Sequence, residues 1–177
     1  TITTDACAHF FTDEESWPEG LWDEVMAGVA AVEGHTGKTF GGAEKPLLFS
    51  VRSGAAVSMP GMMDTVLNLG LNNTTAEGLA RSGANSRFAW DSYRRFIGMF
   101  GDVVLGIHYS RFARVTDRFR RSREENELSV DELKQLVTEL KTVVEDSWGP
   151  FPDDPHEQLR LAINAVFRSF NTPRARY

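Results

Sequence analysis

Apolar residues recur along this chain at two spacings, and the change from one to the other lies near residue 72. Residues 46–51 form a short apolar run bounded by Pro46 and by Ser53-Gly54, which predicts a buried strand. In 65–71 the apolar residues alternate through Leu67, Leu69 and Leu71, which predicts a second strand. Residues 53–64 are small and rich in Gly and Met without periodicity, so we expect a loop between the two strands.

Helical spacing predicts six helices. The first follows the capping-box pattern Ser16-Trp17-Pro18-Glu19 and ends at Gly34. Ser129 and Glu132 form a second capping box, and Asp154 followed by Pro155 is typical of an N-cap and first helical residue. The five later helices are expected over about 74–83, 90–104, 109–122, 129–144 and 154–170.

These elements predict an α+β fold that is predominantly helical, with few strands. A pair of strands is only marginally stable and three or more are usually needed, so we expect further strands outside residues 1–177. The absence of an initiator Met before Thr1 favours the same interpretation, a piece of a longer protein. We divide the chain into residues 1–83, which hold the strands, and 84–177, a helical subdomain or cap.

Composition excludes several classes of protein. Hydrophobic residues make up 41% of the chain, which excludes wholesale disorder, and the single Cys7 excludes a disulfide framework. No apolar run reaches the ~20 residues that span a bilayer, and the first residues lack the basic start of a signal peptide. We expect Cys7 to be a small buried residue, and the four histidines, none spaced as a metal-ligand pair, to lie at the surface or in packing contacts.

Charge is unevenly distributed. The chain carries a net charge of −6, and no Lys or Arg precedes Lys38. Residues 81–123 nevertheless contain ten arginines, against only Asp91, Asp102 and Asp117. One interpretation is an anion-binding stripe on a helical interaction module that binds a partner or nucleic acid; the other, which we favour, is that these arginines pair with neighbouring acidic helices and solvent.

The segment from Ser50 to Thr65 contains the clearest candidate chemistry. A predicted strand ends at Arg52, and residues with very small side chains follow it. Small side chains let backbone N–H groups approach an anion closely, and an arginine fork matches phosphate oxygens in a bidentate manner. The pattern fits a polyphosphate-binding loop, but from these residues alone Arg52 fits equally well as the partner of a carboxylate.

The run from Ser50 through Met59-Pro60-Gly61-Met62-Met63-Asp64 to Gly70 closely resembles the signature of the pyruvate, phosphate dikinase family. Two further blocks resemble the same family, Arg87-Phe-Ala-Trp-Asp-Ser-Tyr-Arg-Arg-Phe-Ile97 and Ala165-Val-Phe-Arg-Ser-Phe-Asn-Thr-Pro-Arg-Ala175. The resemblance extends over essentially the whole chain.

The resemblance implies part of an ATP-grasp nucleotide-binding domain, with residues 1–83 in its nucleotide-binding subdomain and 52–65 as the phosphate loop. Arg52 is then expected to contact the ATP phosphates, Gly61 to close over the β- and γ-phosphates, and Met63 to line the adenine pocket. Alanine at position 56 departs from the family members that carry an additional ATP-contacting arginine there, and we assign that position no role.

The resemblance further implies that the full-length enzyme uses ATP and Mg²⁺ and forms AMP, passing the phosphoryl group to a histidine on another domain of the same chain. No catalytic residue and no metal ligand is expected within residues 1–177, and the segment alone is expected to be inactive. We expect a homodimer without membrane or nucleic-acid partners, located in the cytoplasm or in an organelle such as a plastid or glycosome.

Overall fold

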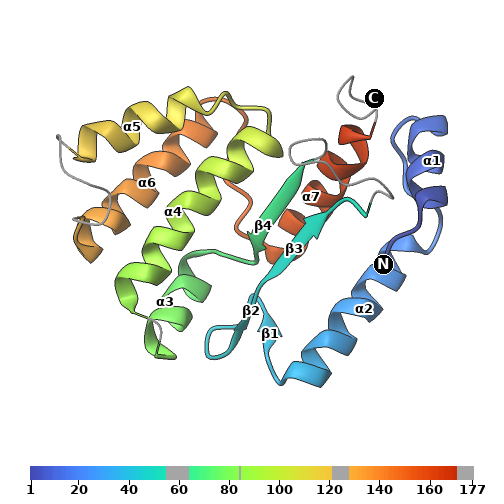
Figure 1. Ribbon diagram of the computed structural model, residues 1–177, viewed down its shortest axis with the longest axis horizontal. Coiled ribbons are helices and arrows are strands. Elements are labelled where there is room, and N and C mark those ends of the chain that lie inside the picture. Colours follow the sequence, from blue (N-terminus) through green and yellow to red (C-terminus); the bar gives the residue numbers. More distant parts are fainter. Residues whose placement is uncertain (55–63, 84, 121–127, 171–177) are drawn as a thin grey trace.

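A computed structural model describes residues 1–54, 64–83, 85–120 and 128–170, and these residues form seven helices and four strands (Figure 1). The prediction of a predominantly helical α+β fold is confirmed. In chain order the elements are α1 (Thr4–Thr12), α2 (Leu21–Thr36), β1 (Thr39–Phe40), β2 (Pro46–Leu47), β3 (Phe49–Arg52), β4 (Thr65–Leu69), α3 (Asn73–Arg81), α4 (Ser86–Val103), α5 (Ser110–Arg120), α6 (Val130–Glu145) and α7 (Pro155–Ser169).

Three helix starts were predicted from capping motifs, and two of these are confirmed. The Ser129 hydroxyl accepts a hydrogen bond from the Glu132 N–H, and the Glu132 carboxylate accepts one from the Ser129 N–H. The Asp154 carboxylate likewise accepts from the His156 N–H at the start of α7. Both caps satisfy backbone donors that a helix start otherwise leaves unpaired.

The third predicted start is wrong. Helix α2 begins at Leu21 after Gly20, whose φ of 78° is left-handed, and the Ser16 hydroxyl instead donates to the Asp13 carboxylate. Before this turn lies α1, a short helix that the periodicity did not predict. It buries Ala6, Cys7 and Phe10, too few apolar positions to show a helical period in the sequence.

The strands form two separate two-stranded sheets. The predicted strand 46–51 is divided between β2, which pairs in parallel with β1, and β3, which pairs antiparallel with β4. In the β3–β4 ribbon Arg52 lies opposite Thr65, Val51 opposite Val66, and Phe49 opposite Leu69. The register therefore shifts by one residue on β4, and Asn68 in this bulge has a left-handed φ of 60°.

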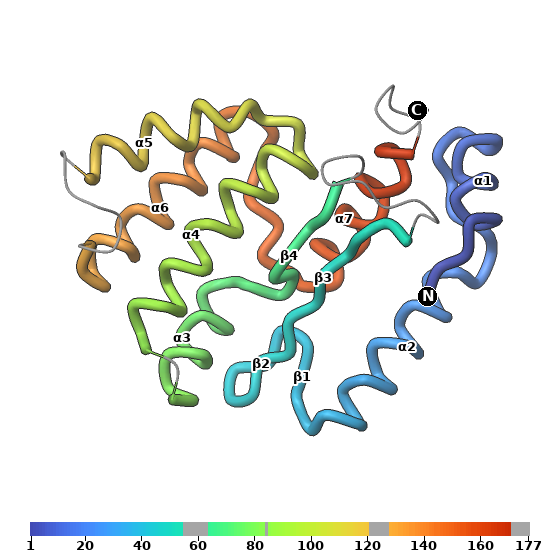
Figure 2. The backbone as a smooth tube through the Cα atoms, in the orientation of Figure 1, coloured from blue at the N-terminus to red at the C-terminus, as the bar shows by residue number. Residues whose placement is uncertain are grey.

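Helices α3–α6 pack together on one side of the ribbon (Figures 1 and 2). Helix α4 lies between α3 and α6, and α5 packs on α6. The aromatic residues of α4 pack with one another and with the segment after α6: the Phe96 ring lies 5.3 Å from the Phe100 ring, and both contact Phe151. The predicted apolar stripe of α4 thus faces the core.

Helix α7 is far from the N-terminal elements in sequence but packs against β3 and β4 and against the α1–α2 segment. The Phe167 ring lies 5.2 Å from the Phe10 ring of α1, and the Trp17 Nε1 donates to the Asn164 Oδ1 at 2.6 Å. Residues from both ends of the chain therefore pack against each other through α7, which also packs on the ribbon. The proposed boundary between 83 and 84 remains a prediction. Across the described ranges, no helix has the length and apolar character needed to cross a membrane.

Candidate functional site

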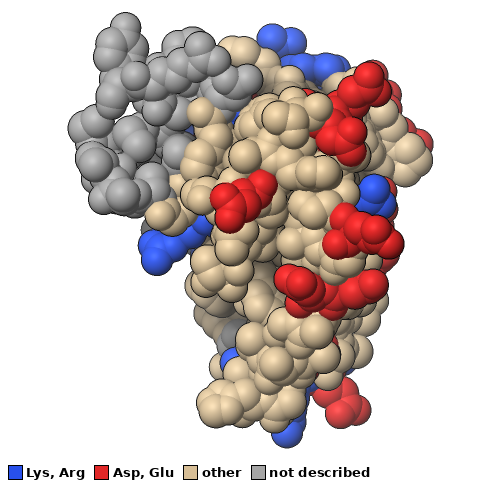
Figure 3. Space-filling model, turned by 90° about the vertical axis from the view of Figure 1, so that its right-hand side faces the viewer, with Lys and Arg blue, Asp and Glu red and all other residues tan. Residues whose placement is uncertain are grey.

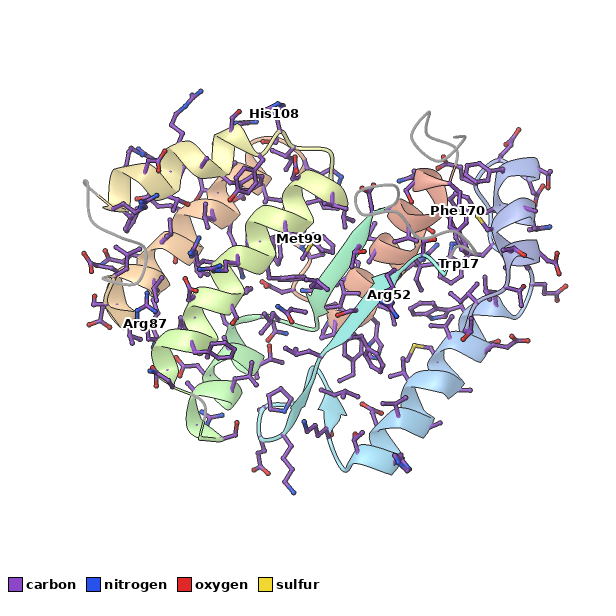
Figure 4. The ribbon with its side chains drawn as sticks, in the orientation of Figure 1. Trp17, Arg52, Arg87, Met99, His108 and Phe170 are labelled. Atoms are coloured by element: carbon purple, nitrogen blue, oxygen red, sulfur yellow. The ribbon has the colours of Figure 1, made fainter. Side chains whose placement is uncertain are left out.

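Arg52 is the last residue of β3 (Figure 4). The predicted phosphate loop, residues 52–65, begins at this end of the strand. Its ladder partner, Thr65, is the first residue of β4. Because two paired strands hold its backbone, Arg52 occupies a defined position at the edge of the loop. The predicted strand end at this arginine is confirmed.

The ribbon has two chemically different faces. On the inner face, Val66 and Leu69 are completely buried, and Val51 and Phe49 are half-buried. The outer face is formed by four exposed side chains, those of Ser50, Arg52, Thr65 and Leu67. Packing against the core therefore directs the Arg52 side chain outward.

The Arg52 guanidinium has no hydrogen bond and no ion pair with any residue that the structure describes. The face of the molecule formed around α1 and α2 carries many carboxylates (Figure 3), yet none of those described neutralises Arg52. The alternative that Arg52 pairs with a carboxylate thus finds no support in the described residues. An exposed, unpaired guanidinium at a strand end is available to bind an anion.

The other two residues expected to bind ATP, Gly61 and Met63, lie outside the described residues, as does Ala56. Asp64, half-buried, comes directly before β4. The structure therefore brings Arg52 together with Thr65 and Leu67, residues that sequence reasoning treated only as parts of a strand.

Several arginines of the 81–123 segment pair with acidic residues. Arg94, only 6% exposed, lies 2.8 Å from the Asp91 carboxylate, which also holds Arg95 at 2.9 Å. Arg118 reaches Glu139 of the neighbouring helix α6 at 3.1 Å. These contacts favour the interpretation of a solvated, ion-paired surface over that of a free anion-binding stripe.

Metal and thiol chemistry find little support elsewhere in the described part of the chain. No group of three or more His, Cys, Asp or Glu side chains there is arranged to hold a metal ion. Cys7 is buried, as predicted, and burial raises the pKa of its thiol, which disfavours the reactive thiolate. His9 and His156 lie beside Asp13 and Asp154 at 3.6 and 3.5 Å.

Two shallow hollows of about 350 Å³ each open on the described surface, and neither includes Arg52. One lies between α5 and α6 and is lined by Arg118 and Glu139, which neutralise each other. The other surrounds the turn between β1 and β2. We place the candidate site at Arg52 because the family resemblance gives this position a role in binding phosphate and because its guanidinium has no partner among the described residues.

Comparison with known proteins identifies close relatives. No protein-family model matches the chain. It is 48% identical over 179 residues to pyruvate, phosphate dikinase 1 of Arabidopsis thaliana, a chloroplastic protein, and 51% identical over 180 residues to pyruvate, phosphate dikinase of Giardia intestinalis. It is 47% identical over 180 residues to pyruvate, phosphate dikinase 2 of Zea mays.

Each alignment covers 99% of this chain but only 18% to 20% of the relative. The chain thus spans about a fifth of the length of the proteins it matches. The resemblance predicted from residues 50–70 is confirmed and extends over nearly every residue described above. The chain is therefore a relative, along almost its whole length, of one segment of the pyruvate, phosphate dikinases.

Proposed function

We propose that this chain forms part of the ATP-binding domain of a pyruvate, phosphate dikinase. That enzyme interconverts ATP, phosphate and pyruvate with AMP, pyrophosphate and phosphoenolpyruvate. The observation that carries the proposal is that Arg52, at the end of β3, is exposed and has no partner among the described residues, in the same signature segment as Met-Pro-Gly-Met-Met-Asp (residues 59–64). The names of the relatives, which match 99% of the chain, support it.

In this proposal the positive charge of Arg52 binds and stabilises the negatively charged phosphates of ATP. Its guanidinium donates two parallel hydrogen bonds to phosphate oxygens and stays protonated at any working pH. In phosphoryl transfer most of the catalytic effect comes from positioning and from electrostatic stabilisation of the transferring group, so one fixed cation contributes substantially. Gly61 closes over the β- and γ-phosphates and Met63 lines the adenine pocket.

The remaining parts of the site lie outside residues 1–177 in this proposal. Other segments of the full-length chain supply the ligands of Mg²⁺, as the family resemblance implies. The ion, when bound, neutralises charge on the phosphates. The histidine that accepts the phosphoryl group belongs to a separate domain, and the full-length enzyme is a homodimer in the cytoplasm or in an organelle.

The proposed fold is a partial ATP-grasp domain. Residues 1–83 contribute to its nucleotide-binding subdomain, and residues 84–177 add a helical cap. Support for a helical cap comes from the packing of α4, α5 and α6 beside the ribbon (Figure 2). Two helices pack across the proposed boundary: α3, within residues 1–83, packs on α4, and α7, within residues 84–177, packs on β3 and β4.

Replacement of Arg52 by alanine in the full-length enzyme tests the proposal. We expect Arg52→Ala to lower the rate of the ATP-dependent half-reaction by at least 100-fold, because the phosphates lose a bidentate charged partner (about 3 kcal/mol or more). Exchange on the pyruvate side should continue at its normal rate. Both half-reactions are measured by isotope exchange on the same preparation.

Arg160→Ala is the matched control, since Arg160 is an exposed arginine on α7. It removes an equal charge from another part of the surface and should leave both half-reactions unchanged. If Arg52→Ala leaves ATP-side exchange intact, Arg52 does not bind the phosphates and the proposal fails.

A further inference from the structure

The outer face of the β3–β4 ribbon presents more polar groups than Arg52 alone. Ser50 and Thr65 are exposed on the same face. Within the described residues, neither hydroxyl has a hydrogen-bond partner, and the same is true of the Arg52 guanidinium. Three polar side chains that have no partner in the described part of the chain, held by paired strands, make a surface that an oxygen-rich ligand satisfies.

The strand register places Thr65 next to Arg52. The two residues lie directly opposite each other in the ladder, and such pairs have Cβ atoms about 4.5–5.5 Å apart on one face. A threonine hydroxyl donates one hydrogen bond and a guanidinium donates up to five. The two side chains do not bond to each other, so both have donors available for a shared acceptor.

The bulge at Asn68 determines what else lies on this face. Its extra residue puts Leu67 and Leu69 on opposite faces, with Leu69 buried and Leu67 50% exposed. Bulges commonly occur beside active sites, where they redirect a side chain. An exposed leucine beside a cation and two hydroxyls suits a ligand with both an anionic and an apolar part, as a nucleotide has.

We propose that Thr65 is a second phosphate-binding side chain, whose hydroxyl donates to the phosphate group that Arg52 holds. The inference rests on the proposed function, because it takes ATP as the ligand of this face. Thr65 then helps to orient the phosphate: the arginine supplies charge, and the hydroxyl restricts rotation of the phosphate about the guanidinium plane.

Removal of the hydroxyl in the full-length enzyme tests this role. Thr65→Val keeps the shape and the strand propensity of the residue, and we expect it to lower kcat/KM for ATP by about 10-fold, the effect of one hydrogen bond to a charged group. Thr65→Ser keeps the hydroxyl and should stay within about 2-fold of the wild type. Exchange on the pyruvate side should not change in either variant.

Thr39→Val serves as the control, because Thr39 is also an exposed strand threonine but belongs to β1 in the other sheet. If Thr65→Val retains full kcat/KM for ATP while Arg52→Ala loses it, Thr65 has no such role and the proposed function still stands. If neither variant affects the ATP half-reaction, both the inference and the proposed function fail. An equal loss on the pyruvate side, or one matched by Thr39→Val, also overturns the inference.

Discussion

Arg52 and Gln158 illustrate two opposite roles for a polar side chain. Arg52 is exposed and has no partner among the described residues, whereas Gln158 is completely buried with every polar atom bonded. The Gln158 Oε1 accepts from the Gly70 N–H at 2.8 Å, and its Nε2 donates to the carbonyls of Leu71 and Pro152 at 2.9 and 2.8 Å. Gln158 thus joins α7 to the end of β4 and to the segment before α7.

Replacement of Gln158 by leucine should therefore destabilise the fold strongly. The variant leaves one buried N–H and two buried carbonyls without partners, and we expect a loss of about 3 kcal/mol in the free energy of unfolding. Urea denaturation measures it. Gln135→Leu, at an exposed position on α6, should change stability by less than about 0.5 kcal/mol. Equal stability of the two variants would show that the Gln158 bonds contribute little.

At the scale of elements, close packing depends on where small residues lie. Gly101 of α4 faces the buried Phe112 of α5, and a Cβ added at Gly101 would overlap the Phe112 ring. Gly28 of α2 has no atom within 4 Å of an added Cβ. Gly101 therefore leaves room for the Phe112 ring between α4 and α5, whereas Gly28 makes no such contact and only lowers the stability of α2.

This difference predicts opposite signs for the same substitution. Gly101→Ala should destabilise the chain by about 1–3 kcal/mol, because the aromatic ring must move within a packed core. Gly28→Ala should stabilise it by about 0.5–1 kcal/mol, because alanine loses less backbone entropy in a helix. Thermal unfolding of both variants measures the two shifts, and shifts of the same sign would contradict the packing of α5 on α4.

At the scale of the whole molecule, the proposed site is incomplete within residues 1–177. The ribbon that holds Arg52 has only two strands in the described part of the chain. The chain also spans only about a fifth of its relatives. Arg52 and Thr65 thus form one wall of the site, and other segments of the full-length protein supply the rest in our proposal.

We therefore expect purified residues 1–177 neither to hydrolyse ATP nor to incorporate phosphate from it. A fixed cation positions a phosphate but transfers nothing without the metal ligands and the acceptor histidine that we place in other segments. The test is incubation of the segment with ATP that is radiolabelled at the β- or the γ-phosphate. Separation of the products measures hydrolysis, and the radioactivity bound to the protein measures phosphate incorporation. Turnover above the buffer rate would show that the segment carries catalytic groups of its own.

The sequence alone was sufficient to predict most of the helices and the position of Arg52. Amphipathic stripes such as that of α4 and caps such as Ser129 with Glu132 depend on local spacing, so they can be identified without knowledge of the fold. The strand end at Arg52 was likewise indicated by a short apolar run followed by small residues.

Other features were decided only by tertiary structure. The alternation of Leu67 with Leu69 predicted a strand, and in a regular strand both would lie on one face. The bulge at Asn68 placed them on opposite faces, because one extra residue reverses side-chain direction. Gln158 gained its role from backbone groups nearly ninety residues away, and the pairing of Thr65 with Arg52 required the register. Contacts between distant residues depend on how the chain folds back on itself, which local patterns do not specify.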